Sequence, residues 1–165
     1  MTRATDRACD GCTACCTVYE VKELEKPEMV ACRHIGLHSC TIYAERPLSC
    51  RAFRCLWLRG LGGDECRPDV SGTLFFMKKT SRLGLLAFAS ESREGALESL
   101  FARAATVALL HRGVRVLHAP TLGNRVLIVP DDVTLTLNDI VELSEEHVDL
   151  LTQRDYVDSL PYTYD

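Results

Sequence analysis

The stretch Cys9-Asp-Gly-Cys12-Thr-Ala-Cys15-Cys16 decides how this chain is organised. Cysteines two residues apart place successive sulfur atoms on the concave side of a tight loop, where several of them face one metal ion or cluster. Gly11 lies where such a loop needs a positive φ angle, which glycine adopts readily. Two C-x-x-C steps that share a cysteine therefore predict a thiolate metal site.

The other cysteines stand at positions 32, 40, 50, 55 and 66, so that all nine lie within the first 66 residues. The N-terminus has no apolar core of signal-peptide length, and no apolar run approaches the roughly 18 residues of a membrane helix. We therefore expect a cytoplasmic protein. Because cytosolic thiols stay reduced, a dense and odd-numbered set of cysteines favours metal binding or redox chemistry over a disulfide framework.

The length of 165 residues and a hydrophobic content of 47% predict one compact unit. We expect a cysteine-rich metal-binding subdomain in residues 1–71 and an α+β part in residues 72–165. No block is basic enough to indicate nucleic-acid binding, and no membrane partner is expected. Residues 130–165 carry one basic and ten acidic side chains. This acidic segment is interpreted as a solvated face, and the alternatives are contact with the more basic residues 72–129 or with a protein partner.

The α+β part is predicted to be a small antiparallel sheet packed by one main helix, in the order ββαββ. Apolar residues 73–78 and 83–89 flank a polar turn and indicate a hairpin. Further strands are expected at 114–119 and 125–129. The cysteine-rich part is predicted to be irregular and to pack on this sheet.

Two helices are expected in the same part. The main helix is predicted to begin at Ser92 and to end before Gly113. A C-terminal helix is expected over residues 139–153, followed by a partly ordered end at residues 156–165. The expected buried face of the main helix consists of Leu97, Leu100, Phe101, Ala104, Val107 and Ala108.

A short helix is also predicted within the cysteine-rich part. Pro47 fits the first turn of a helix, and apolar residues follow it at three- and four-residue spacing. Cys50 and Cys55 are therefore expected on or beside this helix.

Several motifs follow the first cysteine cluster in order. They are Cys32, Cys40-Thr-Ile-Tyr43, Arg46-Pro47 and Cys50-Arg51-x-Phe53. Together they resemble the YkgJ or CxxCxxCC family, whose members are described as zinc- or iron-chelating. They also resemble the cysteine-rich part of flagellin lysine methylases. The resemblance covers roughly residues 9–70 and implies metal chelation by these cysteines, without a defined biochemical activity.

Zinc held by two sets of four thiolates is the first interpretation of the site. Adjacent Cys15 and Cys16 are expected to serve two different metals, or only one of them is a ligand. Iron or an iron–sulfur cluster is the alternative, although the chain lacks the ferredoxin continuation of a fourth cysteine followed by proline. The cysteines that match the family are the predicted metal ligands: Cys9, Cys12, Cys15, Cys16, Cys32, Cys40, Cys50 and Cys55.

Other residues are assigned supporting roles. Cys66 is interpreted as a thiol that does not bind the metal, and His34 and His38 as groups outside the coordination shell, with replacement of a ligand as the alternative for each. Trp57 is expected in the core, and Tyr43 and Phe53 are expected to keep the site dry. Arg46, Arg51 and Arg54 are expected to offset thiolate charge through hydrogen bonds to sulfur.

No catalytic residue is predicted, because the chain contains no phosphate-binding glycine loop, nucleophile elbow or legible S-adenosylmethionine motif. The first hypothesis is a metal-binding protein whose zinc or iron has a structural or binding role. The second is an iron–sulfur or thiol redox protein, including an enzyme. The third is a metal chaperone or store, which needs exchangeable thiolates.

Overall fold

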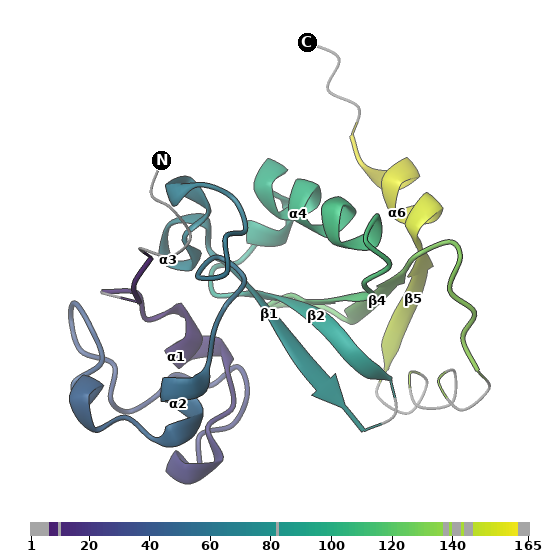
Figure 1. Ribbon diagram of the computed structural model, residues 1–165. Helices are drawn as coiled ribbons and strands as arrows, with labels where there is room; N and C mark the ends of the chain where they lie inside the picture. The colour runs from purple at the N-terminus through teal and green to yellow at the C-terminus, as the bar shows by residue number, and fades with distance from the viewer. Residues whose placement is uncertain are drawn as a thin grey trace.

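A five-stranded mixed sheet organises the α+β part of the protein. The computed structural model describes residues 7–9, 11–81, 83–136, 139, 143 and 147–161. The strands lie in the order β1-β2-β3-β4-β5. Figure 1 shows α4 and α6 along one side of the sheet, while the short helices of the cysteine-rich part gather beside β1. The strands are β1 (Thr73–Thr80), β2 (Gly84–Glu91), β3 (Val116–Ala119), β4 (Arg125–Val129) and β5 (Val148–Thr152).

The helices of the described residues are short, with one exception. The α-helices are α1 (Ala14–Val18), α2 (Leu48–Ala52), α3 (Pro68–Ser71), α4 (Leu100–Leu110) and α6 (Gln153–Ser159). Turns of 3-10 helix lie at Lys22–Leu24, Tyr43–Glu45, Asp64–Cys66 and Ala96–Glu98.

The pairing of the strands corrects the prediction of an antiparallel sheet. The predicted hairpin is confirmed, since β1 and β2 pair antiparallel from Thr73 opposite Glu91 to Thr80 opposite Gly84. The β2–β3 and β4–β5 pairs are parallel, however. A parallel pair needs a crossover, and α4 supplies it between β2 and β3 by returning the chain to the end of the sheet at which β2 begins.

Alternate residues of the strands point to opposite faces of the sheet and build two cores. Phe75 faces α4 and α6, whose buried residues include Leu109, Leu110 and Tyr156. Phe76, the next residue, faces the cysteine-rich part. The core on that side contains Val18, Cys55, Trp57, Cys66, Leu74, Phe76, Leu83, Leu86, Phe88, Leu117, Leu127, Val129 and Leu143.

The main helix begins later than predicted. α4 begins at Leu100, and the side chain of its N-cap Ser99 accepts a hydrogen bond from the Ala102 N–H at 3.2 Å. The predicted start at Ser92 is wrong because the buried Glu91 carboxylate accepts the Leu97 N–H at 3.0 Å and holds this segment outside the helix.

The later start also changes the buried face of α4. Leu100, predicted to be buried, is 83% exposed, and Ala104 and Ala108 are exposed as well. Small residues occupy much of the true face, so hydrophobic spacing alone identifies it poorly. The buried residues of α4 are Ala102, Ala105, Thr106, Leu109 and Leu110.

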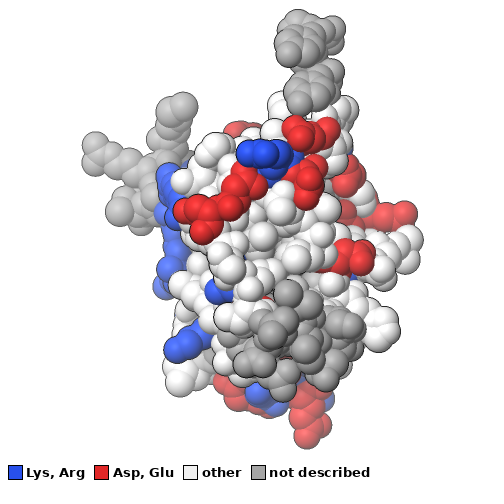
Figure 2. All heavy atoms as spheres, turned by 90° about the vertical axis from the view of Figure 1, so that its right-hand side faces the viewer, with Lys and Arg blue, Asp and Glu red and all other residues white. Residues whose placement is uncertain are grey.

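The C-terminal region corrects a second prediction. Residues 148–152, expected to continue a helix, form β5, which pairs with the free edge of β4. α6 follows, with the Thr152 hydroxyl accepting the Asp155 N–H at 3.1 Å and Tyr156 buried. Residues 140–142 and 144–146 of the predicted helix and residues 162–165 of the predicted end lie outside the described residues. Figure 2 shows the side of the molecule that faces right in Figure 1, where acidic side chains are spread over the upper part.

The cysteine-rich part is joined to the sheet by an aromatic cluster and by one carboxylate. The ring of Phe76 contacts those of Tyr19 and Phe53, each at a centroid distance of 5.6 Å. Glu28 lies between two cations of the sheet, Lys78 at 3.7 Å and Arg125 at 2.8 Å. These contacts place the cysteine-rich part beside β1. Within the described residues, no helix combines the length and the apolar character needed to cross a membrane.

Candidate metal centre

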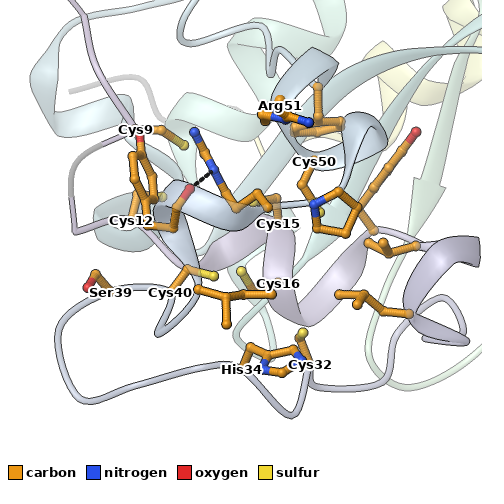
Figure 3. Close-up of a pocket in the computed structure, with 18 of the residues that line it drawn as sticks. Cys9, Cys12, Cys15, Cys16, Cys32, His34, Ser39, Cys40, Cys50 and Arg51 are labelled. Atoms are coloured by element: carbon orange, nitrogen blue, oxygen red, sulfur yellow. Dashed lines mark hydrogen bonds between the residues drawn. The ribbon is translucent and has the colours of Figure 1, made fainter.

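A cavity of about 570 Å³ lies in the cysteine-rich part, and most of the predicted metal ligands line it (Figure 3). Cys55, the exception, is 4% exposed and belongs to the core facing the cysteine-rich part. All nine cysteines of the chain are free thiols. The predicted ligands that line the cavity are Cys9, Cys12, Cys15, Cys16, Cys32, Cys40 and Cys50.

The first motif folds as a turn followed by α1. Gly11 has a φ angle of 72°, which confirms the predicted left-handed conformation. The turn brings Cys9 back toward the helix, where the Cys15 thiol hydrogen-bonds the thiols of both Cys9 and Cys16. Adjacent residues of a helix point about 100° apart. The thiols of Cys15 and Cys16 are nevertheless close enough to form a hydrogen bond.

The loop between Cys32 and Cys40 packs against α1. The Cys32 N–H donates to the carbonyl oxygen of Cys16 at 2.9 Å, and Ile35 forms an isolated antiparallel bridge with Cys40. In Figure 3 the sulfur atoms of Cys16 and Cys40 point toward one another. This loop therefore brings two distant thiols to the same side of the cavity as α1.

The third group of thiols belongs to α2 and the residues after it, as predicted. The carboxylate of Glu23 accepts the Ser49 N–H at 3.1 Å and the Ser49 hydroxyl at 2.8 Å, which fixes the first turn of α2. Cys50, in that turn, interacts electrostatically with the thiols of Cys16, Cys32 and Cys40. Burial is the main cause that raises the pKa of the Cys50 thiol.

Cys55 lies just beyond α2, in a backbone turn that is suited to a thiolate. The backbone N–H groups of Leu58 and Trp57 donate hydrogen bonds to its sulfur, and its thiol interacts electrostatically with Cys9. Burial nevertheless raises its pKa. Donors aimed at sulfur stabilise the ionised form, which is the form that binds metals.

The acidity of the thiols is uneven across the cavity. The hydrogen bond from Cys15 is the largest cause that lowers the pKa of Cys9 to about 6 and that of Cys16 to about 7. The same two hydrogen bonds raise the pKa of Cys15, and burial raises that of Cys12 to about 11. Near neutral pH, Cys9 and Cys16 are therefore the most ionised of these four thiols, while Cys15 keeps its proton between them. A metal bound here would displace that proton.

Cationic side chains surround these thiols. Arg46 helps to lower the pKa of both Cys9 and Cys16, and Arg54 acts on Cys9 and Lys26 on Cys16. Lys26 is only 5% exposed, and its ammonium group donates to the carbonyl oxygens of Tyr19 and Pro27. Burial lowers the pKa of Lys26, and the neighbouring thiols oppose that effect.

Arg46 is held in place by its neighbour. Its guanidinium group lies 3.5 Å from the centre of the Tyr43 ring, and its Nε donates to the Tyr43 carbonyl at 2.8 Å. Tyr43 lines the cavity but is 44% exposed, so it covers the site less completely than predicted, whereas Phe53 packs against Tyr19 at a centroid distance of 4.5 Å.

The other residues with predicted roles fall at different places. Trp57 is buried, which confirms its place in the core, and its indole N–H donates to the Gly63 carbonyl at 2.9 Å. Cys66 is buried outside the cavity, with its sulfur beside the Glu65 carboxylate. His34 lines the cavity, whereas His38 is exposed and does not.

Sequence reasoning missed two cations of the cavity, Lys26 and Arg7. Lys26 is 5% exposed and forms an isolated antiparallel bridge with Val21. Arg7 donates to the carbonyl oxygens of Trp57 and Gly62, both at 2.6 Å. Such contacts of a lysine or arginine with distant backbone atoms leave no motif in the sequence.

The donor chemistry of the cavity fits a thiophilic metal, but the thiols do not form a finished coordination shell. Within the part of the chain that the structure describes, no group of three or more His, Cys, Asp or Glu side chains is arranged to hold a metal ion. The described lining offers thiols and one imidazole and includes no carboxylate. Thiolates of this kind select zinc, copper(I) or iron–sulfur clusters over magnesium or calcium.

No protein-family model, no curated protein and no solved structure matches this chain. The resemblance to the YkgJ family therefore rests on the sequence motifs of residues 9–70 alone.

Proposed function

We propose that this protein is a cytoplasmic metal-binding protein of the YkgJ type, which holds zinc through the thiolates of its N-terminal cysteines. The observation that carries the proposal is the convergence of seven motif thiols, from separate stretches of the chain, on one cavity. Free thiols at all nine positions and a set of nearby cations support it. The metal would act as a cross-link between loops that contain little regular structure.

We group the predicted ligands into two sets of four, which adjoin each other where Cys16 interacts with both Cys9 and Cys15. Cys50 interacts with Cys16, Cys32 and Cys40. Cys9 interacts with the remaining three predicted ligands, which are Cys12, Cys15 and Cys55. We assign one zinc ion to each set, because four thiolates complete a tetrahedral shell. Cys15 and Cys16 then serve different metals, although they are adjacent.

Metal analysis by mass spectrometry, combined with a visible spectrum, tests the proposal on protein purified without oxygen. We expect a colourless protein with about two zinc ions per chain. If the protein is brown and contains iron and sulfide, it binds an iron–sulfur cluster instead of zinc, and redox chemistry becomes the proposed function. A protein without bound metal after anaerobic purification and zinc reconstitution would refute the proposal.

Two cysteine variants test the division into sets. Cys12→Ser is expected to lose one zinc ion and to keep the other, and Cys50→Ser is expected to lose the opposite one. Selective cysteine labelling followed by mass spectrometry identifies which thiols become reactive in each variant. Loss of both ions in both variants would contradict two separate sites and would favour one shared cluster.

A metal store or chaperone is the second candidate. Seven of the nine cysteines are partly exposed, which favours exchange of a bound metal with solvent ligands. Transfer of zinc to a competing chelator within seconds would support this role, whereas retention over hours would support a structural one.

The acidic side chains in the upper part of Figure 2 are a candidate surface for a basic protein partner in either case.

A further inference from the structure

The cavity is much larger than a metal ion requires. Four-coordinate structural zinc sites are closed shells, whereas volumes of about 300–1,000 Å³ are typical of pockets for organic molecules. The cavity of about 570 Å³ falls in the second class. Part of its wall is apolar and aromatic, and consists of Tyr19, Val21, Leu24, Ile42, Phe53 and Leu58.

The polar part of the wall is cationic. Arg7, Lys26, Arg46, Arg51 and Arg54 line the cavity, and no aspartate or glutamate accompanies them among its described lining residues. Three of the five cations are engaged with the protein itself. Lys26, Arg46 and Arg7 donate to backbone carbonyl oxygens.

Arg51 and Arg54 differ from these three. Both are exposed at the cavity, and neither guanidinium group forms a hydrogen bond or ion pair with another described residue. Figure 3 shows Arg51 beside Cys50, on the wall formed by α2 and the residues after it. A guanidinium group matches the two oxygen atoms of a carboxylate or phosphate with two parallel hydrogen bonds.

We propose that the cavity binds a small organic anion beside the metal, with Arg51 and Arg54 pairing its carboxylate or phosphate group. The aromatic wall of Tyr19 and Phe53 contacts the apolar part of this molecule. The position of the anion beside a metal rests on the proposed metal-binding function, but its recognition by the two arginines does not. The site then has room for a substrate or a metal-delivering ligand.

Calorimetric titration of the purified full chain, as isolated and after zinc loading, tests this inference. The probes are phenyl phosphate and benzoate, with benzyl alcohol as their neutral counterpart. We expect both anions, or one of them, to bind at least about tenfold more tightly than benzyl alcohol. Preference for phenyl phosphate identifies a phosphate ester as the natural class of ligand, and preference for benzoate identifies a carboxylate.

The double variant R51Q/R54Q is expected to weaken anion binding by about tenfold or more. R59Q/R112Q is its matched control, because it removes two exposed positive charges that do not line the cavity. This control is expected to bind the anions as the unmodified protein does. Equal weakening in both double variants, equal binding of benzyl alcohol, or no binding of either anion would overturn the inference.

Zinc content, measured on the same samples, separates this inference from the proposed function. R51Q/R54Q and the unmodified chain are therefore compared at equal zinc content, because Arg54 also lowers the pKa of the predicted ligand Cys9. A weakening of anion binding that disappears at equal zinc content would overturn the inference, since the two arginines would then act through the metal centre. Anion binding by a chain that takes up no zinc would refute the metal-binding function and leave the anion site standing.

Discussion

Two regions of the molecule are stabilised in different ways. They are the cysteine-rich region, which is the cysteine-rich part over residues 7–71, and the sheet region, which is the α+β part over residues 72–161. Six buried hydrophobic residues lie in the described part of the first region, against 22 in the described part of the second. The α-helices of the first region have at most five residues, whereas β1 and β2 have eight residues each. Burial of apolar area therefore stabilises the sheet region far more than the cysteine-rich one.

This difference indicates that the cysteine-rich region needs another source of order. Small units with a weak core commonly use metal ions or disulfides for this purpose, and free thiols line the cavity here. The region also packs against the sheet through the contacts of Phe76 with Tyr19 and Phe53. Variants that remove either support separate the two contributions.

Removal of a metal ligand is expected to have the largest effect. Cys50→Ser would remove one ligand of its set, and metal binding to four thiolates contributes on the order of 10 kcal/mol to folding. Hydrogen exchange measured by mass spectrometry should show lost protection around Cys16, Cys32, Cys40 and Cys50, and retained protection around the other set of ligands and in β1 to β4. Leu48→Ala, at an exposed position of α2, is the control and should keep its zinc.

If β1 to β4 lost protection together with the cysteine-rich region in Cys50→Ser, the two regions would be one cooperative unit. Unchanged zinc content in Cys50→Ser would instead remove Cys50 from the ligands.

Loss of the aromatic contact between the regions comes second. Phe76 is 1% exposed, and its ring packs against Tyr19 and Phe53 on one side and Phe88 on the other. Phe76→Ala is expected to cost about 3–5 kcal/mol in the free energy of unfolding, because it leaves a cavity between the regions. Denaturant unfolding followed by circular dichroism measures this change.

The exposed Leu100→Ala is the control for Phe76→Ala and should change stability by less than about 0.5 kcal/mol. A similarly small effect of Phe76→Ala would show that the regions do not depend on this contact.

The two regions also differ in how far the sequence predicts them. The strand at Arg125–Val129 and the short helix around Cys50 lie where local patterns place them. The start of α4 was missed because a tertiary contact of Glu91 decides it. β5 was missed because residues 148–152 carry a helix-like pattern, and their pairing with β4 outweighs it.

In the cysteine-rich region the motif spacing identifies the thiols that line the cavity. Their preference for thiophilic metals follows from the residue type alone. The cavity itself and its cations do not follow, because they depend on how distant loops pack. Lys26 is the clearest case. Its buried ammonium group lies beside several thiols of the cavity, and no sequence motif links Lys26 to those cysteines.

The sheet region contains a titrating group of its own, which gives the third effect. His118 is buried between α4 and α6, with its Nε2 2.9 Å from the Thr106 hydroxyl and its ring against Tyr156. Burial lowers its pKa from 6.5 to about 4, although Glu98 and Glu91 act in the opposite direction. Between these values the unfolded chain binds the proton and the folded one does not, so stability falls as the pH drops below 6.5.

We expect a loss of about 2 kcal/mol between pH 8 and pH 5 from His118. Denaturant unfolding of the zinc-loaded chain at both pH values measures it, and His118→Gln should lose that part of the pH dependence. His111→Gln, at an exposed position, is the control. Equal pH dependence in His118→Gln and the unmodified protein would assign the acid sensitivity to the thiols instead.

The smallest effect is expected for replacement of Cys66. This variant tests whether Cys66 is a buried thiol or a metal ligand. Its side chain lies in the core facing the cysteine-rich part, outside the cavity, and burial raises its pKa. Cys66→Ser replaces sulfur by a hydroxyl of smaller volume and should cost about 1 kcal/mol, while zinc content stays as in the unmodified chain. Loss of one zinc ion in Cys66→Ser would mean that Cys66, and not one of the eight motif cysteines, completes a coordination shell. The dependence of the cysteine-rich region on metal would then extend to the residues that pack directly on the sheet.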